Sequence, residues 1–490
     1  MLFEPMMPIE RRKPLHAKVA VMSVGLDTYW RQFPGLLEEM QRKSRCLVQK
    51  LSTHQVEVTD IGMVDCQEAA DRALPQLMSA DPEVLFVDMV TYATSAAFAP
   101  IVRAMRCPVV LVALQPLAAM DYAVGTTYMQ LCNDDICAVP EFAGVAVRLG
   151  HPVADVIIGQ LAGDAVADEA LAEWCRIAHV RHDLRRARLG HLGHVLDTML
   201  DMQTDDTALT TAFGCHAVPC EPDEILTEYT QLTPDVPEVQ AMSRRILEFF
   251  DTPDPGADSI TEKLTRADLA TAARAAVALE RFIAKKRLDG LAYYYEAIPG
   301  SEMRELVTNF IVGNSLLTSA GFPMCGEFDI KTCVAMFIMD RLEIGGSFAE
   351  FHPMDFARDT ILVGHDGPHH LNIADRKPVL RSLKKYHGKP GSGAGVEFNI
   401  RTGPITLLSI GVTATGTFQF VVAEGESVAG DIPPTGNTNT HGRFAPDLRT
   451  FLRQWCLAGP THHFALGVGH HADAIAKVAR SFNVPAVIIR

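Results

Sequence analysis

The chain has no Cys-x-x-Cys pair, although it contains 11 cysteines among its 490 residues. An odd number of scattered cysteines, without a recognisable signal peptide, predicts reduced thiols rather than a disulfide framework. No window reaches the roughly 18 uncharged apolar residues of a membrane span. Even the apolar stretch at 85–102 contains Asp88. We therefore expect a cytoplasmic protein with no membrane partner.

Basic residues are also fewer than acidic ones. Lys and Arg number 44 against 59 Asp and Glu, which gives a formal net charge of −15. Nucleic-acid binding needs clustered cations, so no nucleic-acid partner is expected. Two phosphate-binding motifs are missing as well. The first predicted strand is not followed by Gly-x-Gly-x-x-Gly, and the glycine-rich stretch 388–395, interpreted as a hairpin or lid, lacks Walker spacing.

The composition is that of an ordinary globular protein, with 48% hydrophobic and 21% charged residues. At roughly 150 residues per domain, the length suggests about three domains. The first region, assigned to 1–178, alternates short apolar runs with helical spacing, which predicts βαβ units and a parallel sheet. The expected strands are 19–24, 56–62, 84–89 and 108–114.

A second α/β domain with a parallel sheet is predicted over 179–345, and it includes an expected strand at 291–296. The pattern changes over 346–490, where short apolar segments are separated by Gly and Pro. This predicts an antiparallel β domain, barrel-like, with weak helical periodicity until 472–481. The expected strands are 348–356, 360–364, 396–400, 405–412 and 417–424.

Two carboxylates and two imidazoles stand out in the last two regions. Glu327 lies in a Gly-flanked turn, and Glu350 ends a predicted edge strand. His365 follows an apolar run, and His463 follows a Gly-Pro turn. This donor set suits a divalent cation such as Mn²⁺, Co²⁺ or Zn²⁺. Each residue also has a plainer interpretation, because most single Glu residues are solvated and most single His residues are hydrogen-bonding partners.

The segments around these residues resemble the L-arabinose isomerase / L-fucose isomerase superfamily, nearer its arabinose isomerase side. Gly326-Glu-Phe-Asp-Ile-Lys-Thr332 resembles the family's Gly-Glu-Gly-Asp-Trp-Lys-Thr, and Ser347-Phe-Ala-Glu-Phe351 resembles Ser-Phe-Met-Glu-Asp. Leu362-Val-Gly-His365 resembles Leu-Gly-Ser-His, and Ala458-Gly-Pro-Thr-His-His463 resembles Ala-Gly-Gly-Ala-His-His. The order and spacing of the motifs agree from about residue 170 to about residue 470.

The resemblance implies a metal-dependent aldose–ketose isomerase that transfers a proton between C1 and C2 through an enediol. Glu327 and Glu350 would be both the acid/base pair and metal ligands, with His365 and His463 as the other ligands. Mn²⁺ is the favoured metal, with Co²⁺ and Mg²⁺ as alternatives. A hydride shift is the rival mechanism. The resemblance also implies a trimer-based homo-oligomer, with a hexamer favoured, in which N-terminal loops cover the metal of the next subunit.

The family's N-terminal sugar-contacting segments differ here. Leu26-Asp-Thr-Tyr-Trp30 replaces Gln-His-Leu-Tyr-Gly, and Cys132–Glu141 replaces Gln-Thr-Ala-His-Gly-Gly-Arg-Glu. We therefore expect an altered monosaccharide specificity. The candidate substrate-binding residues are Asp27, Tyr29, Gln115, Asp134, Asp135, Glu141, His370 and His462. The alternative is a non-catalytic sugar-binding or sensor protein on the same scaffold. A metal-dependent hydrolase would lack a base for its water once both Glu residues are ligands.

Overall fold

The computed structural model describes residues 2–253, 263–383, 385–386, 389–390, 393–433 and 438–490. The glycine-rich stretch at 388–395 therefore falls partly outside the described residues. The chain forms two compact units, one of residues 15–183 and one of residues up to 14 together with 184–490. The division into domains 1–178, 179–345 and 346–490 stays a prediction. No helix within the described ranges combines the length and apolar character needed to cross a membrane.

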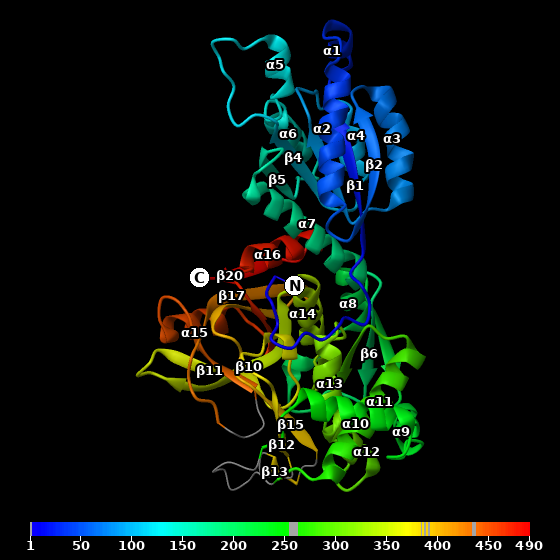
Figure 1. Ribbon diagram of the computed structural model, residues 1–490, viewed down its shortest axis with the longest axis vertical. Helices are drawn as coiled ribbons and strands as arrows, with labels where there is room; N and C mark the ends of the chain where they lie inside the picture. The colour runs from blue at the N-terminus through cyan, green and yellow to red at the C-terminus, as the bar shows by residue number, and fades with distance from the viewer. Residues whose placement is uncertain (1, 254–262, 384, 387–388, 391–392, 434–437) are drawn as a thin grey trace. The chain divides into compact units, whose positions relative to one another are not determined.

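The unit of residues 15–183 is a five-stranded parallel sheet with accompanying helices, in the order β2-β1-β3-β4-β5 (Figure 1). Strand β3 is buried along its whole length, as expected of continuous apolar runs in a covered parallel sheet. The four predicted strands are confirmed, and β5 is an additional one. The strands are β1 (Ala17–Val24), β2 (Val56–Val64), β3 (Val84–Met89), β4 (Val109–Gln115) and β5 (Asp155–Gln160). The helices are α1 (Asp27–Gln32), α2 (Leu36–Leu51), α3 (Gln67–Ala80), α4 (Phe98–Ala104), α5 (Thr127–Cys132), α6 (Val139–Arg148) and α7 (Ala165–Leu184).

The second unit begins with a four-stranded parallel sheet, in the order β7-β6-β8-β9, which confirms the predicted second α/β region. Its strand β8 is shorter than predicted and ends at Tyr293. The strands are β6 (Arg188–Leu192), β7 (His216–Cys220), β8 (Gly290–Tyr293) and β9 (Met324–Cys325). The helices are η1 (Leu200–Met202), α8 (Asp206–Phe213), α9 (Pro222–Thr230), α10 (Pro237–Phe249), α11 (Arg266–Lys286), α12 (Glu302–Thr308), α13 (Phe310–Ser319) and α14 (Ile330–Arg341).

A closed antiparallel barrel of six strands follows. Its order is β16-β19-β10-β11-β18-β17, and β17 pairs back with β16. The predicted barrel-like domain is thus confirmed, and closure removes free strand edges. The barrel strands are β10 (Gly345–Asp355), β11 (Thr360–His365), β16 (Gly403–Val412), β17 (Phe418–Val428), β18 (Thr438–Arg443) and β19 (Phe464–Val468). The remaining elements are η2 (Leu371–Ile373), β12 (Val379–Ser382), β13 (Lys385–Tyr386), β14 (Lys389–Pro390), β15 (Ala394–Glu397), α15 (Leu448–Leu457), α16 (Ala472–Ser481) and β20 (Ala486–Ile489).

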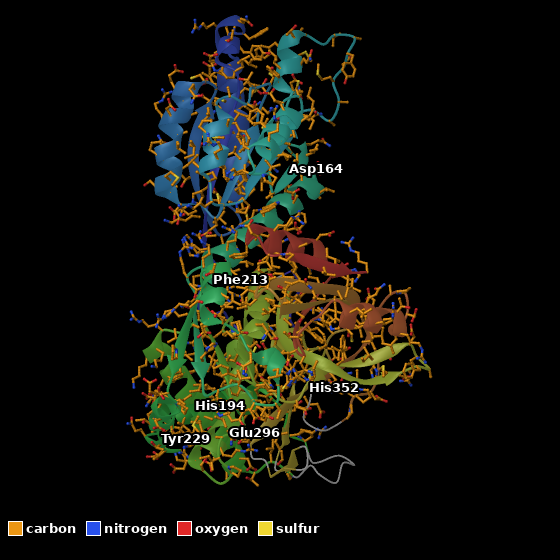
Figure 2. The ribbon with its side chains drawn as sticks, turned by 180° about the vertical axis from the view of Figure 1, so that it is seen from behind. Asp164, His194, Phe213, Tyr229, Glu296 and His352 are labelled. Carbon is orange, nitrogen blue, oxygen red and sulfur yellow. The ribbon has the colours of Figure 1, made fainter. Side chains whose placement is uncertain are left out.

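Helix α14 connects the parallel sheet to the barrel. Each of its residues is buried, and it contacts β8 and β9 of the sheet as well as β10, β16 and β19 of the barrel. A helix with no polar face belongs inside a core. A glycine allows its close approach to β10, because a Cβ at Gly346 would lie 2.8 Å from the Met336 carbonyl oxygen. Helix α8 adds a second contact through Phe213, whose ring lies 5.3 Å from that of Phe418 on β17 (Figure 2).

The expectation of weak helical character before residue 472 was wrong for α15. Leu448, Phe451 and Trp455 are its buried residues, and their spacing follows one face of a helix. Asp447 caps the helix by accepting from the Thr450 N–H. The apolar stripe is short and interrupted by Arg and Gln, so packing against the barrel decides its conformation.

Candidate metal and active site

Glu327 lies in the strained connection between β9 and α14. Glu327 and Phe328 both adopt left-handed backbone, with φ of +56° and +62°. For residues other than Gly this costs on the order of 1–3 kcal/mol each. The Phe328 N–H donates to the Tyr293 carbonyl at 3.0 Å, and its ring lies 4.6 Å from that of His191. These contacts hold the turn that presents the Glu327 carboxylate.

The barrel brings the other three predicted ligands to Glu327. Glu350 on β10 pairs with Gly364 on β11, so it lies beside His365. The Nε2 atom of His365 lies 3.9 Å from Oε1 of Glu327 and 4.0 Å from Oε1 of Glu350. His463, just before β19, has its Nε2 atom 3.5 Å from Oε2 of Glu327. The structure therefore gathers all four side chains.

Hydrogen bonds on the far side of each imidazole determine which nitrogen faces the carboxylates. The Nδ1 atom of His463 lies 3.0 Å from Oδ2 of Asp329, and Nδ1 of His365 lies 3.0 Å from the Asp366 carbonyl. A carbonyl only accepts, so Nδ1 of His365 carries the proton and its Nε2 a lone pair. Burial lowers the pKa of His365 to about 4, which keeps the ring neutral.

The same arrangement holds for His463. Although burial alone would raise the pKa of Asp329, the His463 hydrogen bond and the nearby Lys331 lower it to about 2. The ionised carboxylate accepts the Nδ1 proton, which leaves Nε2 of His463 buried and without a hydrogen-bond partner among the described residues. Two lone pairs and two carboxylates thus face one another, and such donors oriented by outer hydrogen bonds fit a divalent cation.

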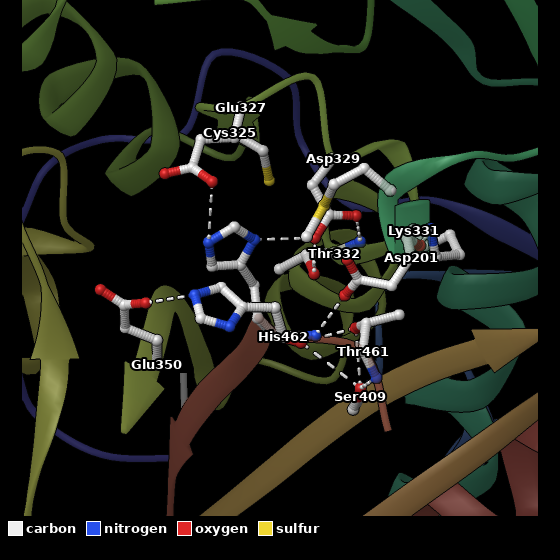
Figure 3. A network of polar contacts seen from close by, with 12 residues as sticks. Asp201, Cys325, Glu327, Asp329, Lys331, Thr332, Glu350, Ser409, Thr461 and His462 are labelled. Atoms are coloured by element: carbon white, nitrogen blue, oxygen red, sulfur yellow. Dashed lines mark hydrogen bonds and ion pairs between the residues drawn. The ribbon is translucent and has the colours of Figure 1, made fainter. Parts of the chain in front are cut away.

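His462 lies beside this group and contacts Glu350 (Figure 3). Its Nε2 atom donates to Oε2 of Glu350 at 2.6 Å, and this hydrogen bond raises the pKa of His462. Burial would raise the pKa of Glu350, but the His462 hydrogen bond and the neighbouring imidazoles outweigh it and lower that pKa to about 2. The His462 side chain is 49% exposed, whereas that of His463 is fully buried. His462 is thus accessible to solvent, and its role as a substrate-binding residue stays a prediction.

A second layer of contacts, which the sequence reasoning did not find, supports His462. The buried Lys331 ammonium donates to the Asp201 carbonyl at 2.7 Å and to Thr204 Oγ1 at 3.1 Å. The Asp201 carboxylate accepts from the His462 backbone N–H at 2.8 Å. Asp329 caps α14 by accepting from the Thr332 N–H. Its contact with His463 joins distant parts of the chain, so no local pattern indicates it.

His370 is not part of this group. It is buried, and its Nε2 atom lies 3.9 Å from Oδ1 of Asp340, which also binds Arg11 and Arg341. Its backbone N–H donates to Ser347 Oγ at 3.2 Å. These contacts fix the segment that follows His365 against the interior.

The remaining candidate substrate residues lie in the unit of residues 15–183, near the carboxyl ends of β1 and β4. The pKa of Tyr29 is raised by burial, by Tyr92 and by Asp134, which shows that these groups are neighbours. Asp135 is buried and binds Lys43 at 2.6 Å, so it anchors its loop. Glu141 accepts from the N–H and hydroxyl of Ser95, Gln115 donates to the Leu117 carbonyl, and Asp27 accepts from the Thr28 hydroxyl.

Comparison with known proteins agrees with the motifs. A family profile describing the L-arabinose isomerase C-terminal domain matches residues 345–485. An L-arabinose isomerase of Nocardioides sp. is 24% identical over 396 residues, covering 79% of this chain and 76% of that protein. One from Klebsiella pneumoniae (strain 342) is 23% identical over 359 residues, covering 71% and 68%. The chain is arabinose isomerase-like.

The resemblance predicted from the four motifs is thereby confirmed at the level of sequence. L-arabinose isomerase 1 of Bacillus licheniformis, 24% identical over 361 residues, covers 71% of the chain and 69% of its own length. Among solved structures, a C2-type ketoreductase from a modular polyketide synthase matches with a TM-score of 0.21 and 10% identity, over 65% of this chain and 82% of that one. That score is too low to support an argument.

The contact between Asp329 and His463 yields a prediction about metal affinity. Asp329→Asn removes the charge that accepts the Nδ1 proton, so the tautomer with Nε2 free is no longer favoured. Loss of such an outer partner lowers metal affinity by about 10–100-fold. We expect this loss for Mn²⁺, measured by calorimetric titration of metal-free protein.

Asp447→Asn is the matched control, because Asp447 caps α15 as Asp329 caps α14. Each carboxylate binds the N–H and the hydroxyl of a Thr three residues later. Only Asp329 also contacts an imidazole. The control should bind Mn²⁺ as the unaltered protein does, and equal affinities for both variants would show that Asp329 acts as a cap alone.

Proposed function

We propose that the protein is a metal-dependent aldose–ketose isomerase that interconverts an aldose and its 2-ketose by C1/C2 proton transfer through an enediol. The observation that carries the proposal is that Nε2 of His365 approaches both the Glu327 and Glu350 carboxylates while Nε2 of His463 approaches Glu327. Glu327, His365 and His463 form one group able to hold a metal ion, and Glu350, His462 and His463 form an adjoining one. A divalent cation held there, with Mn²⁺ favoured over Co²⁺ and Mg²⁺, would supply Lewis-acid polarisation of two adjacent substrate oxygens. The similarity to proteins named L-arabinose isomerases supports this assignment.

The reaction needs two groups that can each take and return a proton. The lowered pKa of Glu350 keeps its carboxylate ionised at neutral pH and therefore able to accept a proton from carbon. Glu327 lies on the other side of the two imidazoles and is the candidate for moving the hydroxyl proton. The side chains of both Glu residues are 18% exposed, so a bound sugar can reach them. The proton accepted from C2 returns to C1, so the isomerisation needs no external reductant or oxidant.

His462 positions one of the two proposed proton-transferring carboxylates. Its hydrogen bond to Oε2 of Glu350 orients that carboxylate and leaves Oε1 directed toward His365. Because His462 is half exposed, we propose that it also contacts a substrate hydroxyl. Asp201 and Lys331 hold its backbone in place.

We further propose an altered sugar specificity and a shared active site. The changed segments Leu26–Trp30 and Cys132–Glu141 place Asp27, Tyr29, Asp134 and Glu141 as contacts to the far end of the sugar, with Asp135 holding the loop. By analogy with the family, these loops would cover the metal site of a neighbouring subunit in a trimer-based oligomer, with a hexamer favoured. The proposed location is cytoplasmic.

The acid/base assignment predicts the effect of two isosteric substitutions. Glu327→Gln and Glu350→Gln each remove a group that transfers protons, and a positioned acid or base contributes about 10²–10⁴-fold in rate. We expect turnover of any accepted aldose, assayed with added Mn²⁺, to fall by at least that factor in each variant. In deuterated water the unaltered protein should place solvent deuterium in the product.

Glu426→Gln, an exposed change on barrel strand β17, serves as the control and should retain full activity. Complete retention of the substrate hydrogen in the product would contradict the enediol mechanism and support a hydride shift. Undiminished activity in a thoroughly metal-free preparation would refute the metal dependence. If no aldose is turned over although sugars bind, the sensor alternative would be favoured.

The altered loops predict a changed substrate preference. Buried polar groups reject an analogue whose hydroxyls do not match them, because they are then left unpaired. We expect L-arabinose to be a poor substrate, with kcat/KM below about 10⁴ M⁻¹s⁻¹. A panel of pentoses, 6-deoxyhexoses and branched sugars, assayed with Mn²⁺, should contain a better one. Efficient turnover of L-arabinose would show that the loop changes are neutral.

A further inference from the structure

A cavity of about 640 Å³ opens on the barrel beside the start of β11. Thr360 begins this strand and lines the cavity, whereas the candidate metal ligand His365 ends it. Five steps along an extended strand correspond to about 17 Å. The cavity is therefore separate from the candidate active site, and its size is within the usual range for small-molecule sites.

Cationic side chains gather around this cavity. Arg358, Arg376 and Arg443 line it, with His441 beside them, although the chain as a whole carries a net charge of −15. Among the described residues, the Arg443 side chain has no hydrogen bond or ion pair, and the Arg376 guanidinium binds only the neutral Asn399 amide oxygen, at 2.8 Å. The Arg358 guanidinium lies 3.8 Å from the Asp355 carboxylate, which instead accepts from the Arg358 backbone N–H at 3.0 Å. Guanidinium groups without close carboxylates are suited to an anion from solution.

The wall of the cavity is organised by hydrogen bonds. Asn399, which orients Arg376, donates from its other amide atom to the Gly430 carbonyl at 2.9 Å. His441 donates from Nε2 to the Asp431 carbonyl at 2.9 Å. A Cβ at Gly430 would lie 2.3 Å from Cδ2 of His441, so glycine allows this close approach. Arg376 and His441 are therefore held in place before any ligand arrives.

A buried hydroxyl at the cavity lacks a partner. Thr360 is 1% exposed, and its Oγ1 atom makes no hydrogen bond within the described chain. Leaving a buried hydroxyl unpaired is unfavourable, and a ligand that pairs with it removes that cost. Asp375 and Asp431 also line the cavity, and their carboxylates can accept hydrogen bonds from ligand hydroxyls. The cavity thus offers cations for an anionic group and acceptors for hydroxyl groups.

We propose that this cavity binds a phosphorylated, hydroxyl-bearing metabolite of monosaccharide size. Arg376 and Arg443 bind the phosphate, for which guanidinium geometry is well matched. Thr360, Asp375 and Asp431 bind the hydroxyls. This second site is independent of the isomerase reaction proposed above, since it shares no residue with the candidate metal centre.

The test is calorimetric titration of the full-length, Mn²⁺-loaded protein with glucose 6-phosphate, glucose and inorganic phosphate at low salt. We expect saturable binding of one glucose 6-phosphate per chain, weaker binding of inorganic phosphate and none of glucose. The double variant Arg376→Gln/Arg443→Gln should weaken glucose 6-phosphate binding at least tenfold. Arg449→Gln, which removes one guanidinium group over the Phe356 ring in the same barrel region, should leave it unchanged.

Thr360→Val provides a second variant that keeps the volume and removes the hydroxyl. We expect it to weaken glucose 6-phosphate binding without lowering the Tm, because Oγ1 has no partner to lose. Absence of saturable binding, or equal binding by the double variant, would overturn the proposal. Equal affinity for inorganic phosphate and glucose 6-phosphate would overturn the assignment of the hydroxyl-binding residues. None of these outcomes depends on isomerase activity.

Discussion

Hydrogen-bond acceptors face one another where the second parallel sheet meets the barrel, and much of the surrounding structure serves to keep them there. The Nε2 atoms of His365 and His463 point toward the carboxylates of Glu327 and Glu350, with separations of 3.5–4.0 Å. Such groups repel one another and are costly to bury unless positive charge offsets them. Within the described chain, His462 is the side chain that donates to a carboxylate of this group. A divalent cation would supply the missing positive charge.

The scaffold keeps this arrangement through connections between the parallel sheet and the barrel. Glu327 is at the carboxyl end of the parallel sheet, whereas Glu350, His365 and His463 belong to the barrel. Helix α14 contacts both and is buried throughout, and Asp329 at its start reaches His463. The left-handed backbone at Glu327 and Phe328 is strain of the kind found at functional sites. The family motif quoted above has glycine at the position of Phe328, where left-handed backbone is less costly. Here the Phe328 ring packs against His191.

The two ends of strand β11 differ in their electrostatics. At His365 the strand meets carboxylates and neutral imidazoles, which suit a cation. At Thr360 it meets guanidinium groups without a carboxylate at hydrogen-bond distance and a buried hydroxyl, which suit a phosphate ester. In the unit of residues 15–183, a buried ion pair holds the loop at Cys132–Glu141. Lys43 is buried with Asp135 and also donates to the Val90 and Cys132 carbonyls, so this loop is held to its own sheet while Asp134 stays partly exposed.

Local sequence was enough to predict the parallel sheets and most barrel strands. It also indicated Glu327 and the three residues that gather near it, Glu350, His365 and His463. Strand periodicity and Gly or Pro punctuation are local properties, and the four motifs kept their order and spacing. Helix α15 was not predicted because its apolar stripe is short, and packing against the barrel is what stabilises it as a helix. Local sequence also did not predict the roles of Asp329, Asp201 and Lys331. Nor did it predict the burial of Asp135 and His370. These depend on contacts between residues far apart in the chain, and only the closed barrel and the packing of α14 decide which of them meet.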